Sequence, residues 1–228
     1  MYVPSIFYKV YEKTLHRQIF ADQRPHHVGL IVDGNRRFAL AQKLATRKAG
    51  HMAGSDNLEG FLRWCLDLEI KMVTLYGFST ENYNRSGEEV EELMSIILSK
   101  FRTLKTDPLI ADENVKIKVI GRRDQLSQEM NEEIDTVEAQ TAEHSSFQLN
   151  IAIGYGGRAE IVDAVKKIGE QIKIGEIDIG DIDEQLLSNH LYTEGMPDPD
   201  LIIRTSGEER LSGFLLWQSA YSELYFTE

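Results

Sequence analysis

The feature that most constrains the fold is the alternation of short runs rich in valine and isoleucine with longer stretches of helical periodicity. Buried parallel strands are apolar on both faces, and the connections between them contain helices. The sequence therefore predicts an α/β fold, a single domain with a six-stranded, mostly parallel sheet flanked by helices. The predicted strands cover residues 27–32, 71–78, 115–121, 147–154, 200–205 and 223–227.

The chain is predicted to have two segments. Residues 1–25 are expected to form an N-terminal amphipathic helix, because apolar side chains recur on one helical face and basic side chains lie elsewhere. Such a helix can dock on the protein body or contact a membrane surface. No repeat and no Pro/Gly-rich linker divides residues 26–228, so these are predicted to form one domain.

Charge and hydropathy exclude several classes of protein. The formal net charge of −12 opposes binding to nucleic acid, whose phosphates attract clustered lysine and arginine. No apolar run has the length of a membrane span, and the N-terminus lacks the apolar core of a secretory signal. We therefore expect a cytoplasmic protein, with peripheral membrane contact as an added role for residues 1–25.

Candidate ligand-binding residues follow four of the predicted strands. In parallel sheets, ligands bind beyond the carboxyl ends of the strands. At these four ends glycine, small polar residues and arginine occur together, which suits the binding of anions. The segments are residues 33–37, residues 78–82 with Arg85, residues 154–158, and residues 204–207 with Arg210 and Ser212.

The first of these segments combines an acid with cations. Gly34 and Asn35 permit a tight turn, and three arginines add charge-assisted donors for a phosphate. Asp33 has two alternative roles, as a salt-bridge partner that orients the arginines or as a ligand of Mg2+ together with substrate phosphates. The arginines are Arg36, Arg37 and Arg47.

The last segment indicates a second phosphate site, built from Arg204, Arg210 and Ser212. The alternative is that these arginines are surface residues that neutralise Glu208 and Glu209. Two cation clusters at one sheet edge would suit a reaction that joins two phosphorylated molecules.

Three other features have alternative interpretations. His51 either packs at a helix N-terminus or bonds to a substrate phosphate, since no His or Cys partner lies at metal-ligand spacing. Glu223 is either a metal ligand or a solvated surface residue. The segment "GYGGR" at 154–158 lacks the G-x-G-x-x-G spacing and the following acid of a dinucleotide-binding loop.

Five sequence blocks together resemble a known enzyme family. They are "HVGLIVDGNRRFA", "GHMAGSDNL", "TLYGFSTENYNRS", "LNIAIGYGGRAEIVDAV" and "PDPDLIIRTSGEERLSGFLLWQSAYSELYF". In this order and spacing they resemble the conserved blocks of the cis-prenyltransferases, the group of undecaprenyl and dehydrodolichyl diphosphate synthases. Arg36 resembles the archaeal and eukaryotic branch more than the bacterial one, in which glycine is usual.

The resemblance implies an activity and partners. It implies Mg2+-dependent condensation of isopentenyl diphosphate with an allylic diphosphate, farnesyl or geranylgeranyl, to give a cis-polyprenyl diphosphate for lipid glycan carriers. It also implies a homodimer. The alternative is a non-catalytic subunit of a cis-prenyltransferase complex.

The resemblance also assigns roles to individual residues. Asp33 and Asn82 match catalytic positions, and Asp33 and Glu223 match metal-associated ones. The positions that bind the allylic diphosphate are matched by Gly34, Asn35, Arg36, Arg37, Arg47 and His51. The lid over the allylic substrate is matched by Phe78, Ser79, Glu81 and Arg85, and the isopentenyl diphosphate site by Arg204, Arg210 and Ser212.

A growing prenyl chain needs an apolar space. We expect a tunnel walled by the apolar faces of predicted helices at 53–69 and 86–105, with ordinary core packing as the alternative for each side chain. The candidate wall residues are Phe61, Leu62, Leu93, Met94 and Ile97.

Overall fold

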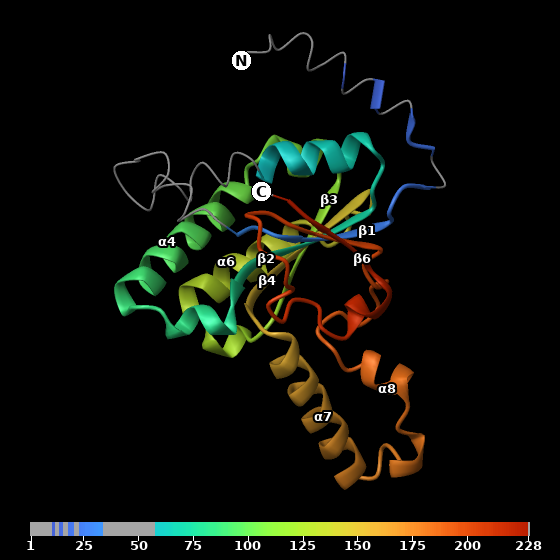
Figure 1. Cartoon of the computed structure of the whole chain (residues 1–228). Coiled ribbons are helices and arrows are strands. Elements are labelled where there is room, and N and C mark those ends of the chain that lie inside the picture. Colours follow the sequence, from blue (N-terminus) through green and yellow to red (C-terminus); the bar gives the residue numbers. More distant parts are fainter. Residues whose placement is uncertain (1–10, 12–13, 16–17, 21–22, 34–57, 228) are drawn as a thin grey trace.

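The computed structural model describes residues 11, 14–15, 18–20, 23–33 and 58–227 (Figure 1). This part of the chain contains one six-stranded sheet in the order β3-β4-β2-β1-β5-β6, and every strand pair is parallel. The predicted α/β fold with a six-stranded sheet is therefore confirmed. The strands are β1 (His27–Ile31), β2 (Met72–Ser79), β3 (Val115–Ile120), β4 (Phe147–Tyr155), β5 (Leu201–Arg204) and β6 (Glu223–Phe226).

Helices occupy the connections between the strands. Ser86 caps α4 by accepting a hydrogen bond from the backbone N–H of Glu89 at 3.4 Å, in agreement with the helix predicted at 86–105. Residues 58–67 are also helical. The α-helices are α4 (Gly87–Leu104), α5 (Pro108–Asp112), α6 (Gln128–Gln140), α7 (Gly157–Lys173) and α8 (Glu184–Ser188), and the 3-10 helices are η2 (Thr80–Asn84), η3 (Arg123–Gln125), η4 (Ile179–Asp181) and η5 (Gln218–Tyr221).

Side chains on the two faces of the sheet form two apolar clusters. Successive strand residues point to opposite faces, so Val28 joins the larger cluster and Ile31 the smaller one. The larger cluster, here called the main core, includes apolar residues of α4, α5 and α6, and α4 and α6 lie side by side (Figure 1). The smaller cluster contains Tyr76, Tyr155 and Phe214.

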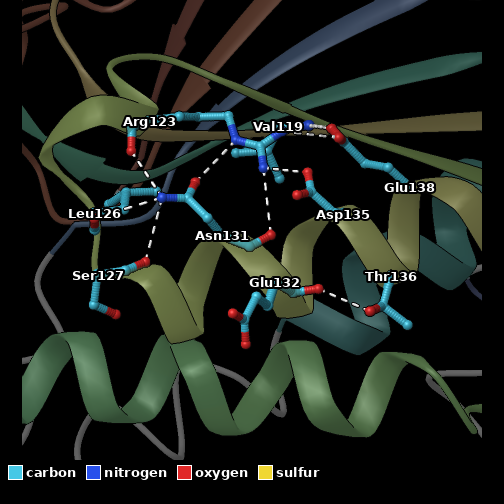
Figure 2. Close-up of polar contacts among 9 residues, drawn as sticks. All are labelled: Val119, Arg123, Leu126, Ser127, Asn131, Glu132, Asp135, Thr136 and Glu138. Atoms are coloured by element: carbon cyan, nitrogen blue, oxygen red, sulfur yellow. Dashed lines mark hydrogen bonds and ion pairs between the residues drawn. The ribbon is translucent and has the colours of Figure 1, made fainter.

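The outer edge of β3 is covered by side chains from α6 and its C-cap. The backbone N–H of Val119 donates to Oε1 of Glu138 at 2.7 Å (Figure 2), and that of Ile117 donates to Oγ1 of Thr141 at 3.1 Å. Arg123 donates in turn to Oε2 of Glu138 at 3.1 Å. Because unpaired N–H groups at a sheet edge can pair with another chain, these contacts close that edge.

Two predictions extend beyond the described residues. In the predicted helix at 1–25, residues 11, 14–15 and 18 are helical, and most of the others lie outside the described part of the chain. Across the described residues, no helix combines the length and the apolar content that crossing a membrane requires. Leu93, Met94 and Ile97 of α4 are partly buried against the main core, and the product tunnel stays a prediction.

Candidate active site

A pocket of about 1100 Å³ lies at the carboxyl ends of the sheet strands. Its lining comes from the ends of β1 and β2, the turn between β4 and α7, and the loop after β5. The prediction that these strand ends lie together at one edge of the sheet is therefore confirmed. The predicted site residues that line the pocket are Asp33, Ser79, Glu81, Asn82, Arg85, Arg204, Arg210 and Ser212.

Arg204, the last residue of β5, joins two of these segments. Its side chain is only 3% exposed, and Nη2 donates to Oδ2 of Asp33 at 2.6 Å. Nη1 donates to Oγ of Ser212 at 2.8 Å and to the backbone carbonyl of Arg210. Its Nε is buried without a hydrogen-bond partner among the described residues. A buried guanidinium that lines a cavity and keeps an unsatisfied donor suits an anionic ligand.

Strand pairing brings Asp33 to Arg204. Ile31 of β1 pairs with Arg204 of β5, and the N–H of Thr205 donates to the carbonyl of Ile31 at 3.3 Å. Just beyond the strands, the hydroxyl of Thr205 donates to the carbonyl of Asp33 at 3.1 Å. These bonds fix the backbone of Asp33, while 40% of its side chain stays exposed at the pocket.

The carboxylate oxygens of Asp33 are ligands of the kind that Mg2+ binds. This ion binds through one or two carboxylates plus substrate phosphates, and keeps several waters. No group of three or more His, Cys, Asp or Glu within the described ranges could enclose a metal, whereas the carboxylate of Asp33 lines the pocket. The position of Asp33 is compatible with both roles that the sequence left open.

Arg210 and Arg204 differ in their surroundings. Arg210 is exposed and pairs with Glu208, as the alternative interpretation of this segment expected. Arg204 is buried, so its interpretation as a surface arginine is wrong. The two arginines nevertheless line the same pocket, and the backbone carbonyl of Arg210 holds the Arg204 guanidinium.

Asn82 and Arg85 come from η2 and the residue after it. Oδ1 of Asn82 accepts a hydrogen bond from the backbone N–H of Ser79 at 2.9 Å. Because the oxygen is used here, the NH2 group of Asn82 is the end that can donate to a ligand. Nη1 of Arg85 donates to Oε1 of Glu89 at 2.7 Å, which ties the segment to α4.

Comparison with known proteins identifies the family. A family model described as "Putative undecaprenyl diphosphate synthase" matches residues 31–228. The chain belongs to the cis-prenyltransferase family. It is 47% identical over 220 residues to the tritrans,polycis-undecaprenyl-diphosphate synthase (geranylgeranyl-diphosphate specific) of Thermoplasma volcanium, a match that covers 96% of this chain and 85% of that protein.

Other relatives support the same assignment. A Methanocaldococcus jannaschii protein of the same description is 49% identical over 222 residues, covering 96% of this chain and 79% of that protein. The crystal structure of lavandulyl diphosphate synthase from Lavandula x intermedia matches with a TM-score of 0.84 and 35% identity, over 89% of this chain and 86% of that one. A probable undecaprenyl diphosphate synthase from Campylobacter jejuni matches with a TM-score of 0.72 and 28% identity, over 90% and 86% of the two chains.

These relatives are synthases, so the protein is a cis-prenyltransferase enzyme. The comparisons therefore support the enzyme and not the alternative of a non-catalytic subunit. The archaeal sources of the similar sequences agree with the branch that Arg36 indicated.

The turn between β4 and α7 of this cis-prenyltransferase requires two glycines. A Cβ atom on Gly156 would lie 2.4 Å from Oγ1 of Thr80, and one on Gly157 would lie 2.6 Å from the carbonyl oxygen of Gly213. The N–H of Gly157 donates to that same carbonyl at 2.8 Å. The glycine pair therefore packs the turn against η2 on one side and against the loop after β5 on the other, which explains "GYGGR" without a dinucleotide.

Arg158, which belongs to the candidate segment 154–158, also lines the pocket, whereas two other lining residues, Tyr76 and Arg122, received no role from the sequence. Arg122 follows Gly121 after β3, and this position after a strand end was the available signal. Tyr76 carries no such signal, because it lies inside β2 where the periodicity indicates ordinary core.

Glu160, in the first turn of α7, is a buried carboxyl that the sequence analysis also missed. The backbone N–H of Tyr192 donates to it at 2.9 Å, Gln218 donates to both of its oxygens, and the hydroxyl of Tyr155 donates to Oε2. Burial raises the pKa of Glu160, and these donors oppose that shift. The bonds tie α7 to η5, which follows the pocket loop.

Two of the described predicted site residues, Phe78 and Glu223, do not line the pocket. Phe78 is 1% exposed in the main core, and its ring contacts that of Tyr83 edge-on at 4.9 Å. Glu223 pairs with Leu201, whereas Arg204 pairs with Phe226, so Glu223 lies about 10 Å along the strand from the pocket end. The residues predicted to bind the allylic diphosphate, Gly34, Asn35, Arg36, Arg37, Arg47 and His51, lie outside the described residues.

Proposed function

We propose that this enzyme condenses isopentenyl diphosphate with geranylgeranyl diphosphate, in a Mg2+-dependent reaction, to give a cis-polyprenyl diphosphate for lipid glycan carriers. The observation that carries the proposal is the buried Arg204, which joins Asp33 to the loop of Arg210 and Ser212 at one pocket. The choice of geranylgeranyl over farnesyl diphosphate rests on the specificity named for the archaeal relatives.

The reaction requires stabilisation of negative charge. The bond between C1 of the allylic substrate and its diphosphate breaks, a bond forms from C1 to the terminal alkene carbon of isopentenyl diphosphate, and a proton leaves the latter. Donors fixed beforehand around the departing diphosphate lower the barrier. Arg204 and Arg210 would bind the isopentenyl diphosphate, and the NH2 group of Asn82 would donate to a diphosphate oxygen at the other wall.

Asp33 is the residue that would hold Mg2+ against the allylic diphosphate, and the ion would supply neutralisation of the leaving group. The pairing of Asp33 with Arg204 has a second consequence. It orients the Arg204 guanidinium, so that the carboxylate of Asp33 connects the proposed allylic diphosphate site with the proposed isopentenyl diphosphate site.

The experiment is incorporation of labelled isopentenyl diphosphate into extractable polyprenyl diphosphate. We expect elongation with geranylgeranyl diphosphate and Mg2+, slower elongation with farnesyl diphosphate, and loss of at least about 99% of the activity in excess EDTA, restored by added Mg2+. Elongation that persists in EDTA would contradict the metal dependence, and faster use of farnesyl diphosphate would contradict the proposed starter.

We propose that the enzyme is a homodimer that buries the outer surface of β6. This strand is an edge of the sheet, with Leu224 and Tyr225 exposed, and Tyr221 just before it is 99% exposed. Apolar side chains along an open strand edge favour association with a second copy.

Sedimentation of the wild-type chain should give twice the chain mass of 26.0 kDa. Leu224→Glu should shift the equilibrium toward one chain, whereas Ile179→Glu, at an exposed isoleucine of η4, should not. A wild-type mass of one chain, or equal effects of the two variants, would contradict the proposed interface.

We also propose a cytoplasmic location with peripheral membrane contact. The support is the sequence pattern of residues 1–25 together with the substrates of the reaction, which are charged at one end while the product lengthens at its apolar end.

A further inference from the structure

The loop after β5 has a strained backbone. Ser206, Ser212 and Leu215 have φ angles of 86°, 50° and 43°, in the left-handed region that residues with a Cβ rarely adopt. Such conformations persist only where surrounding contacts hold them. Ser212 is both strained and a pocket residue, so its contacts decide where its hydroxyl lies.

Tyr76 of β2 supplies one of these contacts from outside the loop. Its hydroxyl lies 3.3 Å from the carbonyl oxygen of Ser212 and 3.4 Å from that of Tyr155. A phenol has one hydrogen to donate, so the two carbonyls share it. The Tyr76 ring stacks on Phe214, with centroids 4.7 Å apart and planes inclined by 22°.

We propose that Tyr76 is a positioning residue for isopentenyl diphosphate, holding Ser212 so that its hydroxyl and Arg204 meet the substrate. The inference rests on the proposed function and names a residue outside the predicted site. Ser212 connects Tyr76 directly to Arg204. Its carbonyl accepts from the hydroxyl of Tyr76, and its Oγ accepts from Nη1 of Arg204 at 2.8 Å.

Two other contacts of the loop are of different kinds. The bond from Gly157 to Gly213 is between backbone groups, and Arg204 is itself a proposed substrate-binding residue. The hydroxyl of Tyr76, by contrast, is a side-chain group that reaches the loop from strand β2. Burial raises the pKa of Tyr76, so its hydroxyl remains a donor at neutral and moderately alkaline pH.

Tyr76→Phe removes this hydroxyl and keeps the ring that stacks on Phe214. Tyr192→Phe is the matched control, because its hydroxyl donates to Asp163 at 2.5 Å in the same part of the molecule without lining the pocket. For each variant, the measurements are the melting temperature, the KM of both substrates, and equilibrium binding of isopentenyl diphosphate by calorimetry.

We expect Tyr76→Phe to raise the KM and Kd of isopentenyl diphosphate by about three- to tenfold, with the KM of the allylic substrate and kcat changed less than about twofold. Tyr192→Phe should leave both KM values unchanged. Unchanged isopentenyl diphosphate binding in Tyr76→Phe, or an equal rise in both KM values, would overturn the role. A folded wild-type protein that neither binds isopentenyl diphosphate nor elongates would instead overturn the proposed function, and this inference with it.

Discussion

Asp33→Ala is expected to lower kcat for chain elongation by a factor of about 10³ or more, because it removes both the carboxylate proposed to bind Mg2+ and the partner of a buried arginine. The measurement is the rate of isopentenyl diphosphate incorporation at saturating substrates over a series of Mg2+ concentrations. A carboxylate that holds the metal should also set the Mg2+ concentration that gives half-maximal rate.

Asp135→Ala is the matched control for this change. Asp135 also pairs with an arginine, Arg123 at 2.5 Å, but on α6 away from the pocket (Figure 2). It should retain wild-type kcat. If Asp33→Ala lost activity but kept the wild-type Mg2+ requirement, Asp33 would act by orienting Arg204, and its role as a metal ligand would be wrong.

Arg204→Met is expected to lower kcat/KM for isopentenyl diphosphate by a factor of about 10² to 10³. A charge-assisted hydrogen bond contributes about 1.5 to 3 kcal/mol, and a bound diphosphate would lose at least one, together with the ordering of Ser212 and Asp33. Steady-state kinetics with isopentenyl diphosphate varied at saturating allylic substrate measures the effect.

Arg123→Met is the matched control for Arg204→Met, because it also removes a guanidinium but not one that lines the pocket. Arg123 donates to Asn131, Asp135 and Glu138 next to α6 and does not line the pocket (Figure 2). Its replacement should lower the melting temperature and leave kcat/KM near the wild-type value. Equal kinetic losses in the two variants would mean that Arg204 acts through stability, which would contradict its place in the site.

Local pattern was enough to predict the six strands and the ends at which ligands bind. Apolar runs such as those containing Val73 and Ile151 must be buried, and parallel strands place their carboxyl ends at one edge. This rule made Asp33, Asn82 and Arg204 candidates, and the family resemblance then assigned their roles. Periodicity also predicted the helix that starts after Ser86.

Tertiary packing decided which of these residues line the pocket and which pack elsewhere, a difference that local sequence patterns do not predict. Phe78 and Ser79 are neighbours in sequence, but Phe78 points into the main core while Ser79 lines the pocket. The pairing of β2 with β4 shifts register between Tyr76 and Ser79, so Phe78 faces the main core although Tyr76, two residues earlier, belongs to the smaller cluster. Gly156 and Gly157 appeared to be a weak nucleotide motif. Their real constraint is the close approach of Thr80 and Gly213, which belong to other segments.

The sequence by itself determined the α/β class, the strand ends and the family, because hydrophobic periodicity and motif spacing are local properties of the chain. Only the tertiary structure decided that Asp33 meets Arg204, that Arg204 is buried, and that Tyr76 reaches the carbonyl of Ser212. These contacts depend on β5 pairing with β1 beside β2, and strand order is set by packing of the whole sheet, which no local stretch of sequence encodes.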